Sequence, residues 1–138
     1  MTSISTITRA VLGFAFVIFG LNYFFNFLPP PKQPPPADAT AFLRLFIGAK
    51  FMALIKAVEV ASGLALLANR FVPLALSLLA PILVGITWFH LSLKPSGLAV
   101  PLVLVALEIA TAWFYREAFA PMLQARAAPA HQPGRAPR

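Results

Sequence analysis

Long stretches of this sequence contain no charged side chain, which limits the environments in which they can fold. Residues 10–31 and 71–93 contain no charged residue, and residues 95–115 contain only Glu108. About 20 apolar residues in a helix are enough to cross the hydrocarbon core of a bilayer. Each of these three stretches is therefore predicted to be a transmembrane helix.

The composition excludes most soluble alternatives. Of the 138 residues, 59% are apolar and 11% are charged, against roughly 45–50% and about 25% in soluble domains. A soluble domain of this length has too little interior to bury so much apolar surface. The absence of cysteine also excludes a disulfide scaffold, a thiol nucleophile and a cysteine-ligated metal centre.

The segment 42–68 is as long and mostly apolar but carries four charges, and we predict that it is a fourth span with a polar face. The proline-rich segment 29–40 must be a loop, because proline removes helical hydrogen bonds. The sequence thus predicts an all-α protein, an integral membrane four-helix bundle. The bundle is predicted over residues 1–122, with helices at about 5–28, 41–68, 71–93 and 97–116, and a disordered cytoplasmic tail over 123–138.

Basic residues predict the orientation of the bundle. Four spans place both termini on one side of the membrane, and that side holds most of the arginines: Arg9, Arg70, Arg116, Arg126, Arg135 and Arg138. The positive-inside rule then places both termini in the cytoplasm. We expect a multi-pass protein of the inner (cell) membrane with the lipid bilayer as a partner. Because no basic face exists outside the membrane ends, no nucleic acid is expected as a partner.

Charged residues near the middle of two predicted helices are the candidate catalytic groups. Lys56 and Glu59 lie at positions i and i+3 of the second predicted helix, and Glu108 lies near the midpoint of the fourth. Ionisable residues at such depth usually face the bundle interior and mark functional sites. A structural interpretation stays open, in which Lys56 and Glu59 form an ion pair that sets the helix register and Glu108 is a second partner of Lys56.

Four polar residues in the outer half of the predicted bundle are candidate ligand-binding residues: Asn22, Asn26, Lys50 and His90. They would line a small polar cavity that opens outward. Interhelical hydrogen bonding or packing is the alternative for the asparagines and the histidine, and Lys50 would then extend to the interface. No metal site is predicted, because His90 and one carboxylate supply too few ligands. No cofactor is evident, although quinone stays open.

Four segments occur in a characteristic order and spacing. They are VLGFAFVIFGLNYFFNFLP shortly after Arg9, KAVEVASGLALLANRFVPLAL from Lys56, LLAPILVGITWFHLSL from Leu78, and WFYREAFAPML from Trp113. In this order they resemble the DoxX family of small four-helix membrane proteins, over about residues 9–122. The positions that match the family pattern are Arg9, Gly13, Gly20, Glu59, Gly63, Pro81, Phe89 and His90. The chain departs from the pattern at Asn22, where many relatives have lysine.

The resemblance implies a redox-associated membrane subunit, because the family is named after the membrane subunit of a thiosulfate:quinone oxidoreductase. The bundle would then hold a quinone head group near His90, and the buried polar cluster (Lys56, Glu59 and Glu108) would supply hydrogen-bonding or proton-relay groups. The chain would work with an oxidoreductase partner subunit, within a quinone-linked complex rather than as an enzyme alone. The alternative is a non-enzymatic assembly or scaffold protein, or a small-ligand-binding protein, of the membrane. A homo-oligomer also stays open.

Overall fold

The computed structural model describes residues 2–127 and 129, which form helices connected by turns and loops. Because these residues contain no strand, the prediction of an all-α protein is confirmed. The elements are α1 (Thr2–Phe25), α2 (Ala37–Gly48), α3 (Phe51–Leu67), α4 (Val72–Leu93), the 3-10 turn η1 (Pro95–Gly97), α5 (Ala99–Phe114), α6 (Arg116–Phe119) and the 3-10 turn η2 (Ala120–Leu123). Of the tail predicted over 123–138, residues 128 and 130–138 lie outside the described residues.

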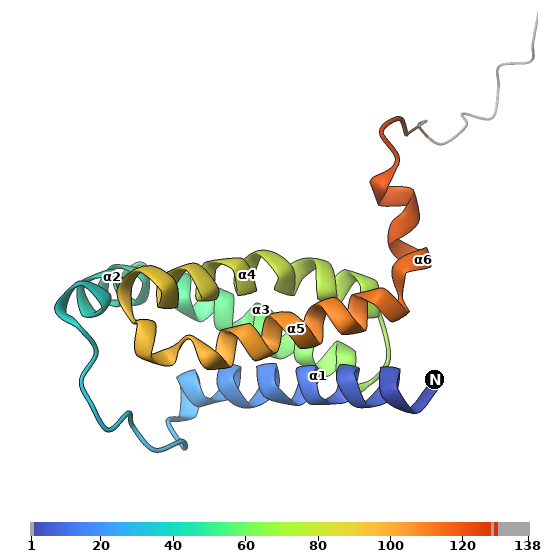
Figure 1. Ribbon diagram of the computed structural model, residues 1–138. Coiled ribbons are helices and arrows are strands. Elements are labelled where there is room, and N and C mark those ends of the chain that lie inside the picture. The colour runs from blue at the N-terminus through green and yellow to red at the C-terminus, as the bar shows by residue number, and fades with distance from the viewer. Residues whose placement is uncertain (1, 128, 130–138) are drawn as a thin grey trace, which may run out of the picture.

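Four of the helices, α1, α3, α4 and α5, run side by side along one axis (Figure 1). Both α1 and α4 contact α3 and α5, so the four helices form a closed ring around a common interior. The apolar core of this ring consists of Leu12, Phe16, Leu66, Val72, Ala75, Leu76, Leu79, Leu83 and Leu104. The N-terminus and the end of α5 lie at the same end of the ring (Figure 1).

Glycines allow α1 and α3 to pack closely. A Cβ atom on Gly63 would lie 2.7 Å from the backbone oxygen of Gly13, and a Cβ atom on Gly13 would lie 2.8 Å from the backbone oxygen of Gly63. Farther along the same pair, a Cβ atom on Gly20 would lie 2.6 Å from Cγ2 of Val60. Small residues at such crossings let two backbones approach, which favours helix association in a bilayer. The contact between α1 and α3, the most extensive between two described helices, therefore depends on these glycines.

The second predicted helix is where the structure differs from the sequence prediction, because it consists of two helices, α2 and α3. Between them, Lys50 has a left-handed backbone conformation with φ 58°, which costs about 1–2 kcal/mol for a residue with a side chain. Aromatic contacts around the break offset this cost. The ring centroids of Phe46 and Phe51 are 5.2 Å apart, and those of Phe42 and Phe89 are 5.6 Å apart. The second of these contacts joins α2 to α4, so the local sequence pattern does not reveal it.

Two helices are long and apolar enough to cross a membrane, at Ser3–Phe25 and Val72–Leu93. A third candidate is α5 together with the segment Arg116–Leu123, which is bent from α5 by 84°. The remaining helix of the ring, α3, has only 17 residues and carries Lys56 and Glu59. By length and composition, the chain is a helical membrane protein.

Candidate functional site

The polar part of α3 centres on an ion pair. The buried face of α3 contains Glu59, Ser62, Gly63 and Leu66 at helical spacing. The ammonium of Lys56, one turn before Glu59, donates to both carboxylate oxygens, with Nζ 3.0 Å from Oε1 and 2.9 Å from Oε2. Glu59 is 1% exposed, whereas the side chain of Lys56 is 19% exposed. The two charges therefore compensate each other inside the bundle.

Glu108 is the second buried carboxylate. It is 7% exposed and lies on the buried face of α5, one turn before the fully buried Thr111. Its Oε2 atom is buried and has no hydrogen-bond partner in the described part of the chain. Among the described residues the ion pair of Lys56 is with Glu59, and Glu108 does not take part in it. Since an uncompensated buried charge costs several kcal/mol, Glu108 requires a proton or a donor on another molecule.

Two buried hydroxyl groups, like Glu108, contain an oxygen without a hydrogen-bond partner in the described chain. They are Oγ of Ser62 on α3 and Oγ1 of Thr87 on α4, neither of which has a hydrogen-bond partner among the described residues. The sequence alone singles out neither residue as a site. The only signal for Ser62 is its i+3 spacing from Glu59, and no local pattern marks Thr87. Three of the four ring helices thus contribute a buried polar atom with unused hydrogen-bonding capacity.

The outer candidates Asn22, Asn26 and Lys50 lie at the ends of helices. Oδ1 of Asn22 accepts a hydrogen bond of 2.7 Å from the backbone N–H of Leu28, which holds the chain where it leaves α1. Asn26 is exposed in a left-handed turn (φ 49°), and Lys50 is exposed at the break between α2 and α3. No hydrogen bond in the described chain joins any two of these residues. Asn22 therefore has a clear structural role as a turn residue.

His90, the fourth outer candidate, packs at the end of α4. Its Nδ1 atom lies 2.9 Å from the carbonyl oxygen of Ile86, a contact that requires a proton on Nδ1. The other side of the His90 imidazole faces η1, where a Cβ atom on Gly97 would lie 2.7 Å from Cδ2 and 2.9 Å from Nε2 of His90. The imidazole also makes an edge contact with the Phe89 ring, and the two ring centroids are 5.3 Å apart. These contacts give His90 a packing role at the turn between α4 and α5.

Arg9 is a buried charged residue that the sequence marks only as a basic residue near a membrane end and as a position of the family resemblance. Its Nη1 atom donates to the carbonyl of Leu66 and lies 3.5 Å from the carbonyl oxygen of Leu67. Both carbonyls belong to the last turn of α3, where the helix dipole favours a positive charge. Arg9 therefore ties α1 to the C-terminal end of α3.

Arg9→Met is expected to lower the free energy of unfolding by about 2 kcal/mol, the usual loss for hydrogen bonds to a charged group. The matched control is Arg70→Met, because Arg70 is an exposed arginine in the turn directly after α3. The measurement is unfolding in mixed detergent micelles, followed by circular dichroism. An equal loss in both variants would show that charge at this end of the bundle matters and that the contacts of Arg9 do not.

These features define a helical membrane protein whose interior holds two carboxylates, one paired with a lysine and one without a partner. Comparison of the chain with protein-family models, curated proteins and solved structures finds no match. Within the described residues, no group of three or more histidine, aspartate or glutamate side chains is placed to hold a metal ion. The candidate functional groups of the interior are therefore the Lys56–Glu59 pair on α3 and Glu108 on α5.

Proposed function

We propose that the chain is a multi-pass protein of the inner membrane, with four spans and both termini in the cytoplasm. The end of the ring that holds the N-terminus and the end of α5 (Figure 1) also carries the exposed Arg70 and Arg116, as the positive-inside rule requires of a cytoplasmic end. In this arrangement α3 also crosses the membrane, as the second of the four spans along the chain. Its 17 residues extend about 26 Å, close to the roughly 30 Å of the hydrocarbon core, and α2 covers its outer end.

We further propose that the chain is DoxX-like. Five of the eight positions on which that resemblance rests are buried in the bundle: Arg9, Gly13, Gly20, Glu59 and Gly63. Gly13 and Gly63 form the crossing of α1 and α3. Arg9 binds the last turn of α3, and Glu59 is buried with Lys56 as its partner. A chance similarity among apolar segments would not select buried polar residues and contact glycines together.

The function that the geometry supports best is that of a redox-associated membrane subunit, whose buried polar cluster handles protons or quinone. The observation that carries this proposal is Glu108, a buried carboxylate in the bundle with an unpartnered oxygen. Ionisable groups inside a membrane are costly, and those that are retained mark proton relays and ligand sites. A purely structural charge is normally compensated within the fold, as Glu59 is by Lys56.

The two carboxylates would have different roles. A bound quinone supplies the redox chemistry, since it accepts two electrons and two protons on becoming a quinol. Glu108 would hold a proton or a hydrogen bond at the head group, because its Oε2 atom has no other partner in the described chain. Glu59 would keep the Lys56 ammonium in place, and the hydroxyl of Ser62 would offer a further donor. The electrons would come from an oxidoreductase partner subunit.

Glu108→Leu tests this proposal, because leucine has similar bulk and can neither hold a proton nor donate a hydrogen bond. The protein is purified in a mild detergent, its bound quinone is extracted and quantified, and the affinity for added ubiquinone is measured from the rise in Tm. We expect the wild-type protein to retain quinone and Glu108→Leu to bind it about fivefold more weakly, because the protonated carboxyl donates to a quinone carbonyl oxygen and a hydrogen bond between neutral groups contributes roughly 0.5–1.5 kcal/mol.

The control is Glu117→Leu, which makes the same change at an exposed carboxylate of α6, outside the ring. This variant should bind quinone as the wild-type protein does. A wild-type protein that contains no quinone and shows no change in Tm on addition of ubiquinone would contradict the quinone proposal. An equal loss of affinity in both variants would show that the effect does not come from the interior of the bundle.

A non-enzymatic assembly or scaffold role is the second candidate, and the Lys56–Glu59 pair favours it. Both carboxylate oxygens of Glu59 are bonded to Lys56, so this part of the cluster needs no ligand. Under this alternative, a defined partner protein co-purifies with the chain, and Glu59→Gln disrupts both folding and that association. Under the redox proposal, a variant that keeps its fold loses quinone binding. The two candidates are thus separated by whether folding and function are lost together.

A further inference from the structure

The end of α5 forms a sharp corner outside the helix ring. After Phe114 the chain turns by 84°, and the segment of α6 and η2 leaves the bundle (Figure 1). The hydroxyl of Tyr115, at the corner itself, donates a hydrogen bond of 3.1 Å to Oδ1 of Asn69 in the turn between α3 and α4. The direction of the outgoing segment is therefore set by a contact with the ring.

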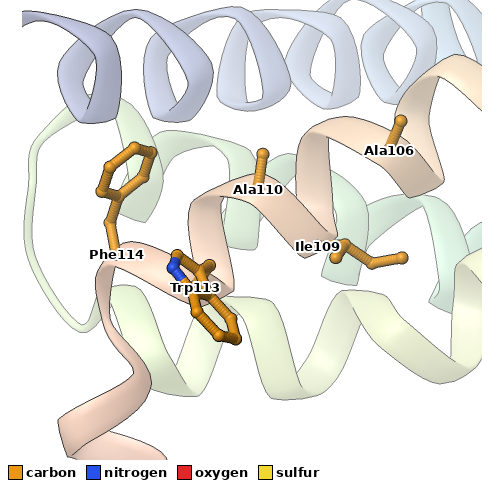
Figure 2. Close-up of a pocket in the computed structure, with 5 residues that line it drawn as sticks. All are labelled: Ala106, Ile109, Ala110, Trp113 and Phe114. Carbon is orange, nitrogen blue, oxygen red and sulfur yellow. The ribbon is translucent and has the colours of Figure 1, made fainter.

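An apolar hollow of about 540 Å³ lies on α5 just before this corner. Figure 2 shows Ala106 and Ala110 one turn apart, with the larger side chains of Ile109, Trp113 and Phe114 beside them. All five lining residues are apolar, and the alanines leave room between the larger side chains. On a helix that spans a membrane, such a hollow faces lipid and fits a hydrocarbon chain.

A positive charge lies at the corner end of the hollow. The guanidinium of Arg116 is 5.4 Å from the centroid of the Trp113 ring, and its Nη1 atom donates to the Trp113 carbonyl at 3.1 Å. Arg116 is exposed and has no carboxylate partner in the described chain. A guanidinium has five N–H donors, and its planar geometry suits bidentate binding of phosphate. Arg116 thus offers donors to an anion beside an apolar hollow.

The segment of α6 and η2 carries exposed apolar side chains beyond the corner that holds Arg116. Met122 is 69% exposed and Leu123 is 84% exposed. A segment at 84° to a membrane-spanning helix runs along the membrane surface, where its apolar side chains enter the boundary between head groups and acyl chains. Trp113, also exposed, is a residue type typical of this interface. The corner is therefore at the depth of lipid head groups.

We propose that the corner of α5 and α6 binds an anionic phospholipid of the bilayer. One acyl chain lies over Ala106 and Ala110, and the phosphate accepts hydrogen bonds from Arg116. The Trp113 ring orients the guanidinium and forms one wall of the hollow, so the two halves of the site share a residue. This inference depends on membrane insertion of α5 and is independent of any quinone or proton chemistry in the interior.

The test measures lipid retention by the full chain. Protein reconstituted with equal amounts of phosphatidylglycerol and phosphatidylcholine of the same acyl chains is extracted in mild detergent, and the retained lipid is quantified by mass spectrometry. We expect the wild-type protein to retain phosphatidylglycerol preferentially and Arg116→Gln to reduce that preference about fivefold, because it removes the charged donors that bind the phosphate. Arg70→Gln, an exposed arginine at the same end of the ring, should leave the preference unchanged.

The hollow is tested separately by adding bulk. Ala110→Phe fills the space and should reduce retention of both lipids, whereas Val103→Phe adds similar bulk to an exposed position of α5 outside the hollow and should not. Circular dichroism confirms that each variant is folded. Equal retention of the two lipids by the wild-type protein, or an equal effect of Arg70→Gln and Arg116→Gln, would overturn the proposal. A dimer that Ala110→Phe disperses without a change in lipid retention would assign the hollow to a second copy of the chain, and would also overturn it.

Discussion

Lys56→Met is expected to lower the free energy of unfolding by about 3–5 kcal/mol, the range observed when one partner of a buried ion pair is removed. The variant leaves the carboxylate of Glu59, which is 1% exposed, without the ammonium that contacts both of its oxygens. Methionine keeps a flexible, unbranched side chain at the position, so the loss reports mainly on the charge. Unfolding in mixed detergent micelles, followed by circular dichroism, measures the effect.

Two further variants locate the cause of that loss. Lys56→Met combined with Glu59→Leu removes both charges and should recover most of the stability, because no uncompensated charge then remains in the interior. Lys50→Met alters an exposed lysine just before the same helix and should change the stability by no more than about 0.5 kcal/mol. A double variant as unstable as Lys56→Met alone would show that the ion pair is not the source of the cost.

Gly63→Leu is expected to lower the free energy of unfolding by about 3 kcal/mol, at the upper end of the range for overpacking. A Cβ atom at this position would lie 2.7 Å from the backbone oxygen of Gly13 and 3.0 Å from the backbone nitrogen of Val17. Backbone atoms cannot move aside as a flexible side chain can, so α1 and α3 must separate. The same micelle unfolding experiment measures the loss.

Gly85→Leu is the matched control, because a Cβ atom on Gly85 would have no neighbour within 4 Å. Gly85 lies inside α4, where replacing glycine by a good helix former should raise stability by up to about 1 kcal/mol. The two substitutions therefore have opposite expected signs, although the chemical change is identical. If both were destabilising to the same degree, the effect would belong to leucine in these helices and not to the crossing of α1 and α3.

The helical class of the chain is predictable from its sequence because it depends on local properties. Apolar stretches of about 20 residues require helices in a bilayer, whatever their neighbours are. The break at Lys50 is different, since it is accompanied by the packing of Phe42 on Phe89, residues of α2 and α4. A contact between distant segments outweighs the local cost of a left-handed residue. Sequence periodicity therefore predicts one helix where the structure has two.

In the candidate site, too, some features can be predicted from the sequence and others depend on contacts between helices. The spacing of Lys56 and Glu59 predicts that they share a face, because i and i+3 are neighbours on any helix, and they form an ion pair. Nothing in the sequence determines whether Glu108 joins them, and the structure leaves its Oε2 atom without a partner in the described chain. The burial of Arg9 against the end of α3 is equally invisible in the sequence, because the carbonyls that it binds belong to another helix.

Three properties of this protein can be predicted without a structure: it is helical, it is apolar enough for a membrane, and it carries a few charges within its apolar segments. Those properties follow from the backbone's need for internal hydrogen bonds and from the cost of moving charge out of water. Which of these charges are compensated depends instead on how the helices pack. Lys56 satisfies Glu59, Arg9 caps α3, Lys50 remains exposed, and Glu108 stays unpartnered in the described chain. Compensation is a matter of distances between side chains and across helices, and packing sets those distances.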